Sequence, residues 1–263
     1  MHATEDAFLD LVDQGKSDPV LLFFQLTEPG ISISSGQNLH LDVDVDRCVE
    51  SGVSFTRRET GGRSVYLDQN HFIASFITRL DAEKDPHVWY DQFCSRLCTV
   101  LGQLVDRPIS VEHTNDLVLR DGRKIGGAAQ RQRGNAVLLH AYIRYTSELA
   151  RALPYLRIDN IPLAPYVREF ETFTAGVSSL LTHRPLSLDA FFISFRSAFA
   201  DIHSATVDVL TVAEQDAIKA RIVKYTEPTW ILGTRKEPSR GNCDLIAGTT
   251  LRIKELEGRV SYK

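Results

Sequence analysis

Two glycine-rich segments contain the residue types that could bind an anionic ligand. In the first, Arg57 and Arg58 come shortly before the adjacent glycines Gly61 and Gly62. Adjacent glycines leave backbone N–H groups accessible to an anion, because no Cβ blocks the approach. Neighbouring guanidinium groups can donate paired hydrogen bonds to phosphate or carboxylate oxygens. A hairpin turn with exposed arginines is the alternative interpretation of this segment.

A lysine introduces the second segment. Lys124 follows the Asp-Gly pair at Asp121 and Gly122, and the next four residues are Ile, Gly, Gly and Ala. Nearly bare backbone permits close contact with a flat or bulky ligand, and the lysine supplies a positive charge. The alternative is a surface lysine on a strand that contains glycine bulges. The two segments contain neither the G-x-G-x-x-G dinucleotide fingerprint nor the G-x-x-x-x-G-K phosphate loop.

The elements that must position these segments can be predicted from the spacing of apolar residues. Recurrence every three to four positions predicts helices, and short runs rich in Phe, Ile, Val and Thr predict strands. The Asp-Gly pair suits a tight type I′ turn, in which both central residues need positive φ. We expect helices at 3–13, 87–105, 147–153, 167–181, 188–204 and 211–225, and strands at 20–26, 31–34, 53–59, 71–80, 116–119 and 136–145. This order favours an α+β domain with one mixed sheet.

Composition places the chain among ordinary globular proteins. Its 263 residues are 43% hydrophobic and 24% charged, which allows one large domain or one domain with a small appendage. A net charge of −4 gives no reason to expect a nucleic-acid partner. The acidic N-terminus is not a secretory signal, and no apolar run approaches the ~18 residues that span a bilayer. We therefore expect a cytoplasmic protein without a membrane segment.

Together the two segments resemble the lipoate–protein ligase A family, within the superfamily of lipoate, octanoate and biotin transferases. The family pattern is an Arg-Arg-x-x-Gly-Gly-Gly-Ala loop that ends in Asp, and later an Asn-Asp strand that leads to Lys-Ile-x-Gly-x-Ala. The matching residues here are Arg57, Arg58, Gly61, Gly62 and Asp68, then Asn115, Asp116, Lys124, Ile125, Gly127 and Ala128. Supporting matches are Gln37-Asn38, Leu138-Leu139-His140, Lys224-Tyr225 and residues 230–233.

The resemblance implies a fold and a domain division. The expected fold is the α+β catalytic domain of biotin and lipoate ligases, which is similar to class II aminoacyl-tRNA synthetases and has a mixed β-sheet flanked by helices. Residues 1–233 would form this catalytic domain. Residues 234–263 would be a C-terminal extension, which could be a remnant of the accessory domain that some of these ligases carry.

The activity that the resemblance implies is ATP-dependent ligation of lipoate to a protein. ATP and Mg²⁺ would activate lipoate to lipoyl-AMP, and the lipoyl group would pass to a lysine of a lipoyl-carrier domain. The expected carriers are domains of 2-oxoacid dehydrogenases or the glycine cleavage H protein. Relatives without the accessory domain can need a separate accessory polypeptide, so we expect this chain alone to activate lipoate poorly.

The resemblance also assigns roles residue by residue, without a protein ligand for a metal. Lys124 would be catalytic, bridging the acyl carboxylate and the α-phosphate. The nucleotide would contact Arg58, Gly61, Gly62, Arg63, Ser64, Val65, Tyr66, Asp68 and Lys124. The acyl substrate would contact Arg58, Gly62, His71, Lys124, Gly127, Ala128 and His140.

Departures from the family pattern keep two other functions open. Arg63 stands at the third glycine of the loop, where a side chain could obstruct a nucleotide or add a phosphate contact, and Ala141 replaces the glycine after His140. One alternative is therefore a non-catalytic relative that binds acyl or nucleotide ligands. The other is an ATP-independent octanoyl or lipoyl transferase, which would need a cysteine nucleophile. The candidates, all outside the motifs, are Cys48, Cys94, Cys98 and Cys243.

Overall fold

A large antiparallel sheet lies at the centre of the computed structural model, which describes residues 1–80, 86–183, 185–233, 253–255 and 259–262. Every strand pair described in this sheet is antiparallel. The strands in spatial order are β12 (Ala205–Asp208), β14 (Arg259–Tyr262), β1 (Val20–Leu26), β5 (His71–Arg79), β9 (Ala136–Arg144), β8 (Lys124–Arg133), β7 (Asp116–Leu119) and β6 (Ile109–Glu112), with β13 (Ile253–Glu255) also paired to β1.

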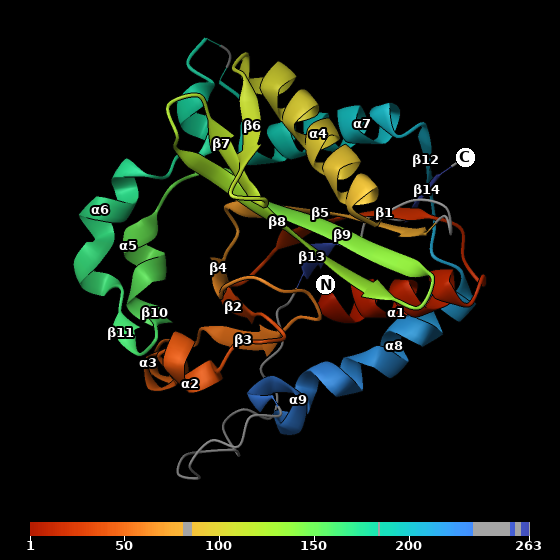
Figure 1. The fold of residues 1–263 in the computed structure, drawn as a ribbon, viewed down its shortest axis with the longest axis horizontal. Coiled ribbons are helices and arrows are strands. Elements are labelled where there is room, and N and C mark those ends of the chain that lie inside the picture. The colour runs from red at the N-terminus through yellow and green to blue at the C-terminus, as the bar shows by residue number, and fades with distance from the viewer. Residues whose placement is uncertain (81–85, 184, 234–252, 256–258, 263) are drawn as a thin grey trace.

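Helices cover both faces of the large sheet, because its central strands carry apolar side chains on both sides. Phe23 and Phe72 pack against α4 (Pro86–Val105) and α7 (Leu188–Ile202). Phe24 and Ile73, one position along, pack on the other face against α1 (His2–Asp13). Figure 1 shows α4 and α7 above the sheet and α1 below it, beside α8 (Val212–Thr226). The expected α+β fold, with a sheet flanked by helices, is confirmed.

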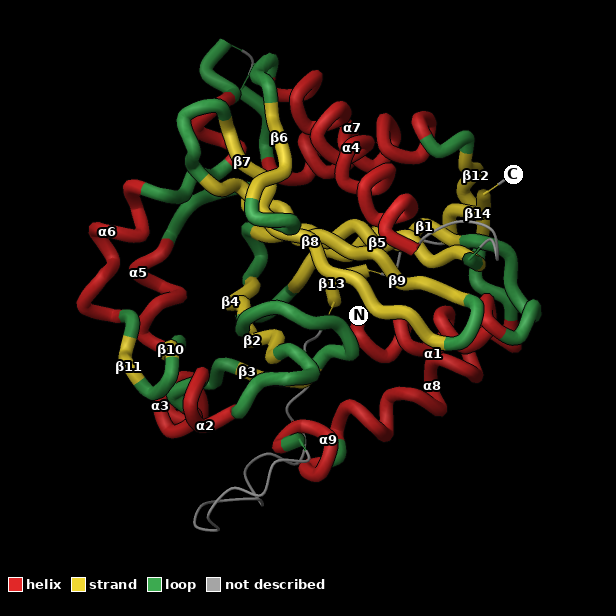
Figure 2. Tube along the Cα trace, viewed as in Figure 1, coloured by secondary structure: helices red, strands yellow, loops and turns green. Residues whose placement is uncertain are grey.

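A second, small sheet carries the first glycine-rich segment. It consists of β2 (Gly30–Ile33), flanked by β3 (Ser54–Arg57) in parallel and by β4 (Val65–Leu67) in antiparallel orientation. Two short helices, α2 (Leu39–Asp42) and α3 (Val45–Ser51), connect β2 to β3. A helical arm, residues 149–172, projects beside this sheet in Figure 2 and includes α5 (Leu149–Ala152), β10 (Arg157–Ile158), β11 (Ile161–Pro162) and α6 (Val167–Thr172).

Arg57, the first arginine of the loop motif, has a structural role. It is 2% exposed, and its guanidinium donates to carbonyl groups at the end of α9 (Pro228–Leu232) and in the turn after β2. The last carbonyls of a helix lack intrahelical partners, so a buried arginine there satisfies them. The acceptors are the carbonyls of Trp230, Ile231, Leu232, Ser34 and Gln37.

Two predictions of local structure are wrong. The helix expected over 167–181 ends at Thr172, because residues 173–175 instead bond to the start of β8: Lys124 N donates to Phe173 O, and Ala175 N to Lys124 O. A 3₁₀ helix then covers Val177–Leu180. The turn at Asp121 and Gly122 is not type I′, since only Gly122 has a positive φ. Asp121 accepts a hydrogen bond from Arg123 N, which gives a three-residue loop that ends in a left-handed glycine.

The C-terminal extension contributes β13 and β14 to the large sheet, where both pair with β1. A domain boundary at residue 233 stays a prediction. Across the ranges described above, we find no helix that combines the length and the apolar character needed to cross a membrane.

Candidate active site

A cavity of about 550 Å³ lies where the small sheet, the large sheet and the helical arm meet. All thirteen residues that the resemblance assigned to the site line it. They come from the loop between β3 and β4, from β4 and the turn after it, from β5, and from the adjacent strands β8 and β9. The fold therefore brings both glycine-rich segments to one cavity. The ligand that each residue contacts stays a prediction.

The guanidinium of Arg58 holds the loop before the glycines in shape. Arg58 is 6% exposed, and its N–H groups donate to protein acceptors on Thr60, Ser32, Gly61 and Arg63. The carbonyls of Gly61 and Arg63 accept at 2.7 and 2.8 Å. These two carbonyl oxygens point toward Arg58, so their partial negative charge does not repel an anion in the cavity. A direct contact between Arg58 and a ligand stays a prediction.

Gln37 connects the turn after β2 to the end of the glycine loop. Its Oε1 accepts from Ser64 Oγ at 3.0 Å and from Ser34 N at 3.4 Å. Further along the loop, the ring of Tyr66 stacks on Tyr155 of the helical arm, with centroids 5.9 Å apart. Side chains from outside the loop thus anchor its C-terminal end, where it leads into β4.

A β-bulge aims Lys124 into the cavity. Val118 pairs with Lys124, whereas Leu117 pairs with Gly126, so Ile125 is an extra residue in β8. Ile125 is fully buried in the core beneath α4, and Lys124 lines the cavity on the other face. Regular alternation would place residues 124 and 127 on opposite faces, yet a Cβ on Gly127 would lie 3.5 Å from Lys124 Nζ, so the bulge brings both residues to the cavity face.

Lys124 is held as a cation. Its Nζ donates to Asp116 Oδ1 at 2.6 Å. Burial acts to lower the pKa of Lys124, but the nearby Tyr142 and Asp116 outweigh it, and the pKa is raised above the ordinary lysine value. A fixed positive charge therefore faces the cavity at neutral pH.

The two glycines after the bulge meet different constraints. A Cβ on Gly126 would lie 2.4 Å from the backbone oxygen of Tyr142. A Cβ on Gly127 would lie 3.1 Å from Tyr142 Cε1 and 3.5 Å from Lys124 Nζ. Gly126 is thus required by packing, while Gly127 leaves room beside the lysine.

Two predicted histidines lie on the cavity wall with carboxylate partners. Asp68 Oδ1 accepts from His71 Nδ1 at 2.9 Å, which orients this imidazole. Burial lowers the pKa of His71 despite Asp68, so the ring is neutral at neutral pH. His140 lies between Glu5, at 2.8 Å from its Nδ1, and Thr60, at 2.9 Å from its Nε2. This carboxylate–histidine–hydroxyl order is not a nucleophilic triad, because Thr60 is fully buried and does not line the cavity.

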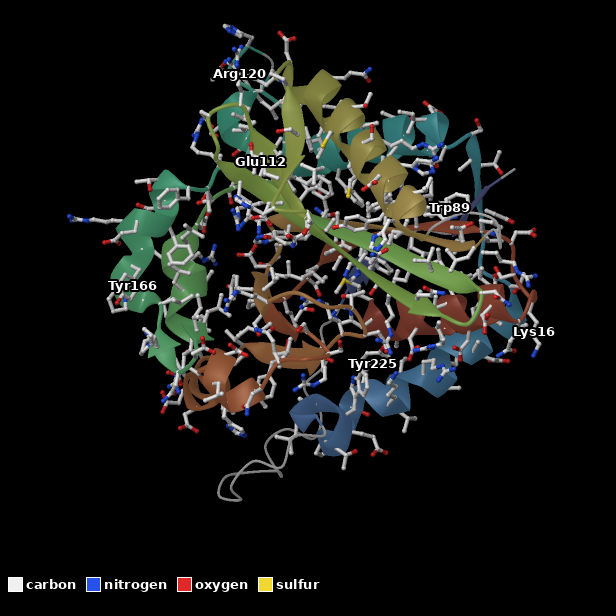
Figure 3. The ribbon with its side chains drawn as sticks, viewed as in Figure 1. Lys16, Trp89, Glu112, Arg120, Tyr166 and Tyr225 are labelled. Carbon is white, nitrogen blue, oxygen red and sulfur yellow. The ribbon has the colours of Figure 1, made fainter. Side chains whose placement is uncertain are left out.

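Sequence reasoning missed two parts of the cavity wall. Tyr142 and Arg144 follow His140 at alternate positions of β9, so strand alternation could have indicated them. The apolar wall on the helical arm belongs to no motif, and only apolar spacing at 149, 153 and 156 hinted at it. In Figure 3, Tyr166 marks the outer edge of this arm. The apolar residues of the arm that line the cavity are Leu149, Ala152, Leu153, Leu156, Ile158, Leu163 and Phe170.

None of the cysteines that the structure describes lines the cavity. Burial raises the pKa of Cys48 and of Cys94 to about 12 and that of Cys98 to about 11, which disfavours the reactive thiolate. Cys243 lies outside the described residues. Within the same described ranges there is no cluster of three or more His, Cys, Asp or Glu that could hold a metal ion.

Arg63 stands where the loop of the family pattern has its third glycine, and a substitution of Arg63 tests what this difference does. Its side chain is exposed at the cavity, and in the part of the chain that is described its guanidinium donates no hydrogen bond. On the expectation from the resemblance that this loop binds ATP, Arg63→Gly should weaken that binding by about threefold to fivefold, the range of an exposed ion pair. Calorimetric titration with ATP measures this effect, and Arg63→Lys should retain most of the affinity. Tighter binding by Arg63→Gly would instead mean that Arg63 obstructs the nucleotide.

Comparison with known proteins identifies the family. The model of the lipoyl protein ligase A/B catalytic domain matches residues 1–200. The lipoate-protein ligase LplJ of Bacillus subtilis is 30% identical over 211 residues, which are 80% of this chain and 58% of LplJ. The octanoyltransferase LipM of Lysinibacillus sphaericus is 22% identical over 254 residues, covering 87% of this chain and 92% of LipM. The chain thus spans little more than half the length of LplJ.

Solved structures share the fold. A bipartite lipoate protein ligase from Thermoplasma acidophilum, described together with its E2 lipoyl domain, superposes with a TM-score of 0.74 at 21% identity and covers 90% of this chain and 94% of its own. A lipoate-protein ligase A bound with ATP gives a TM-score of 0.73 at 22% identity, with 88% and 92% coverage. The matched family model and the shared architecture confirm the resemblance found in the sequence, and the chain belongs to the lipoyl protein ligase A/B catalytic-domain family.

Proposed function

We propose that this chain is an ATP-dependent lipoate–protein ligase, which forms lipoyl-AMP and transfers the lipoyl group to a lysine of a lipoyl-carrier domain. One observation carries the proposal: the cationic Lys124 and the anchored loop at Gly61 and Gly62 line the same cavity. That cavity contains no cysteine from the described part of the chain. We assign residues 1–233 to the catalytic domain.

In the first step, a lipoate carboxylate oxygen attacks the α-phosphorus of ATP. The new bond joins that oxygen to phosphorus, and the bond to the β-phosphate oxygen breaks as pyrophosphate leaves. Negative charge grows on the α-phosphate oxygens, and Lys124 Nζ, already fixed by Asp116, would stabilise it. Preorganisation of the lysine avoids reorganisation at the moment of reaction.

Mg²⁺ fits this site only together with ATP. It commonly binds one or two carboxylates plus phosphate oxygens, and Asp116 is a carboxylate that lines the cavity beside Lys124. The ion would neutralise charge on the pyrophosphate group.

In the second step, the neutral amine of the acceptor lysine attacks the carbonyl carbon of lipoyl-AMP. The bond from that carbon to the phosphate oxygen breaks, AMP leaves, and the amine nitrogen loses a proton to solvent. No enzyme nucleophile takes part. We propose carrier domains of 2-oxoacid dehydrogenases or the glycine cleavage H protein as acceptors, and a separate accessory polypeptide as an aid to activation, because the Thermoplasma relative is described as bipartite.

The decisive experiment measures the mass of an apo lipoyl-carrier domain after incubation with the purified chain, lipoate and Mg-ATP. A parallel reaction omits ATP and supplies an octanoylated carrier. The expected result is a gain of one lipoyl group that requires ATP, slow with the chain alone and faster once a separate accessory polypeptide is added. Absence of modification in both reactions, also after addition of a candidate accessory polypeptide, would favour the binding-only alternative, and calorimetry with ATP and lipoate would then be decisive.

An ATP-independent acyl transferase is the second candidate, because LipM octanoyltransferases are among the relatives. That reaction needs an enzyme thiol, whereas the ligase reaction does not. We expect Cys243→Ser to keep ATP-dependent lipoylation within about twofold of the original rate, since the proposed chemistry uses no cysteine. Transfer of octanoyl without ATP that is lost in Cys243→Ser would establish the transferase instead.

A further inference from the structure

A chain of hydrogen bonds leads from Arg58 to Glu5 on α1 behind the cavity wall. Arg58 Nε donates to Thr60 Oγ1 at 3.0 Å. Thr60 Oγ1 lies 2.9 Å from His140 Nε2, and His140 Nδ1 lies 2.8 Å from Glu5 Oε1. These four side chains are all buried, which strengthens their hydrogen bonds, and two of them, Arg58 and His140, also reach the cavity wall.

A second chain joins the same two residues. Arg58 donates from its Nη1 to Ser32 Oγ at 3.3 Å, and Ser32 Oγ lies 2.9 Å from His2 Nε2. His2 Nδ1 lies 3.0 Å from Glu5 Oε2. Ser75 Oγ donates to Glu5 Oε1 at 2.7 Å, which fixes the carboxylate further. The two chains close a ring between the guanidinium and the carboxylate.

Arg58 and Glu5, at the two ends of the ring, determine the direction of its hydrogen bonds. A guanidinium can only donate and a carboxylate can only accept. With neutral imidazoles, each hydroxyl accepts from Arg58 and donates to a histidine Nε2, and each histidine donates from Nδ1 to Glu5. His2 and His140 are both assigned the Nδ1–H tautomer by this pattern.

The charges of Arg58 and Glu5 agree with this direction of the hydrogen bonds. Burial alone would raise the pKa of Glu5, but electrostatic attraction to His140, together with hydrogen bonds from His140 and His2, outweighs it and holds the pKa well below its ordinary value. Burial lowers the pKa of His2 to about 4, and that of Arg58 to about 10. At neutral pH the ring has a cation and an anion at its ends, with a neutral His2 between them.

We propose that Glu5 is a positioning residue for the glycine loop, acting through both chains of the ring on Arg58. The fixed guanidinium holds the carbonyls of Gly61 and Arg63, so the loop is presented in one conformation before a ligand arrives. The expectation that a rigid loop improves the binding of anionic ligands rests on the proposed function. The existence of the ring, its histidine tautomers and its effect on loop rigidity do not depend on the proposed function.

Thr60 allows a conservative test of the ring. Thr60→Val keeps the shape of the side chain but removes the hydroxyl that links Arg58 to His140, whereas Thr60→Ser keeps the hydroxyl. Thr56→Val is the matched control, because Thr56 is buried in the adjacent strand and its Oγ1 has no hydrogen-bond partner among the residues that the structure describes. Limited trypsin digestion of the ligand-free chain measures cleavage after Arg63. We expect Thr60→Val to speed that cleavage about tenfold, with Thr60→Ser and Thr56→Val close to the original rate.

Binding provides the functional readout. Calorimetry with ATP and with 5′-O-[N-(octanoyl)sulfamoyl]adenosine should show about tenfold weaker binding to Thr60→Val, and rescue by Thr60→Ser. Absence of binding by the original chain, together with the expected digestion pattern, would overturn the proposed function and leave the ring supported. Digestion and binding of Thr60→Val equal to those of Thr56→Val would overturn the positioning role.

The tautomers offer a test that needs no variant. ¹⁵N NMR of the imidazoles in the original chain should find both His2 and His140 in the Nδ1–H form at neutral pH. An Nε2–H form at either residue would overturn the directed ring. If Thr60→Val does not fold, Ser32→Ala interrupts the second chain and is expected to speed cleavage after Arg63 in the same way.

Discussion

Lys124→Ala is expected to reduce the rate of lipoyl-AMP formation by about 10³-fold, the scale of losing one preorganised charge at a transition state. The reason is local: Lys124 Nζ is the cation that Asp116 fixes at 2.6 Å on the cavity wall. Lipoate-dependent exchange of pyrophosphate into ATP measures the first step without an acceptor protein.

A matched control lies one residue away. Arg123 is on the same hairpin, but its guanidinium pairs with Asp121 at an exposed position, outside the cavity. Arg123→Ala should leave the exchange rate within about twofold of the original, as surface substitutions usually do. Near-normal exchange by Lys124→Ala would remove this lysine from the proposed mechanism.

Gly126→Ala is expected to lower both stability and activity. The added Cβ would lie 2.4 Å from Tyr142 O and 3.2 Å from Leu117 Cδ1. The first of these atoms belongs to the backbone of β9, which cannot move away without disturbing its pairing with β8. We expect a loss of about 1–3 kcal/mol in the free energy of unfolding, typical of overpacking. Activity should fall more than stability requires, because the distorted bulge would redirect Lys124.

Urea unfolding and pyrophosphate exchange separate the two effects. Gly127→Ala is a graded comparison, since its Cβ would meet the movable ring of Tyr142 at 3.1 Å. Gly36→Ala is the neutral control, because a Cβ there meets no atom within 4 Å. A Gly126→Ala chain as stable and active as Gly36→Ala would show that the bulge tolerates a side chain.

Several features of the site could be predicted because they are local in sequence. The strand at Val20–Leu26 and the helix at Pro86–Val105 follow from apolar spacing, since burial of one or both faces imposes a period. The glycine motifs resemble those of a known family, and the residues that they assign line one cavity. A motif retains such residues because backbone approach and charge are required at those positions.

Other features depend on contacts between distant segments, which no local pattern carries. The helix expected over 167–181 ends early because Phe173 and Ala175 bond to Lys124, some fifty positions earlier in the chain. The turn type is a separate, local difference: an Asp-Gly pair suits more than one turn, and here Asp121 accepts from Arg123 N and only Gly122 has a positive φ. Sequence spacing also cannot tell that Arg57 binds the carbonyls of α9 while Arg58 binds those of the loop.

By itself the sequence determined the family, the α+β class and the two segments that meet at the cavity, because these depend on residue types and short-range periods. Only the tertiary structure decided the face on which Lys124 lies, since one extra residue in β8 reverses the alternation. Only the tertiary structure joined Glu5 to Arg58, because that ring brings together side chains from α1, β2, β9 and the loop after β3. Hydrogen bonds of this kind depend on distances across the folded chain, which residue order does not specify.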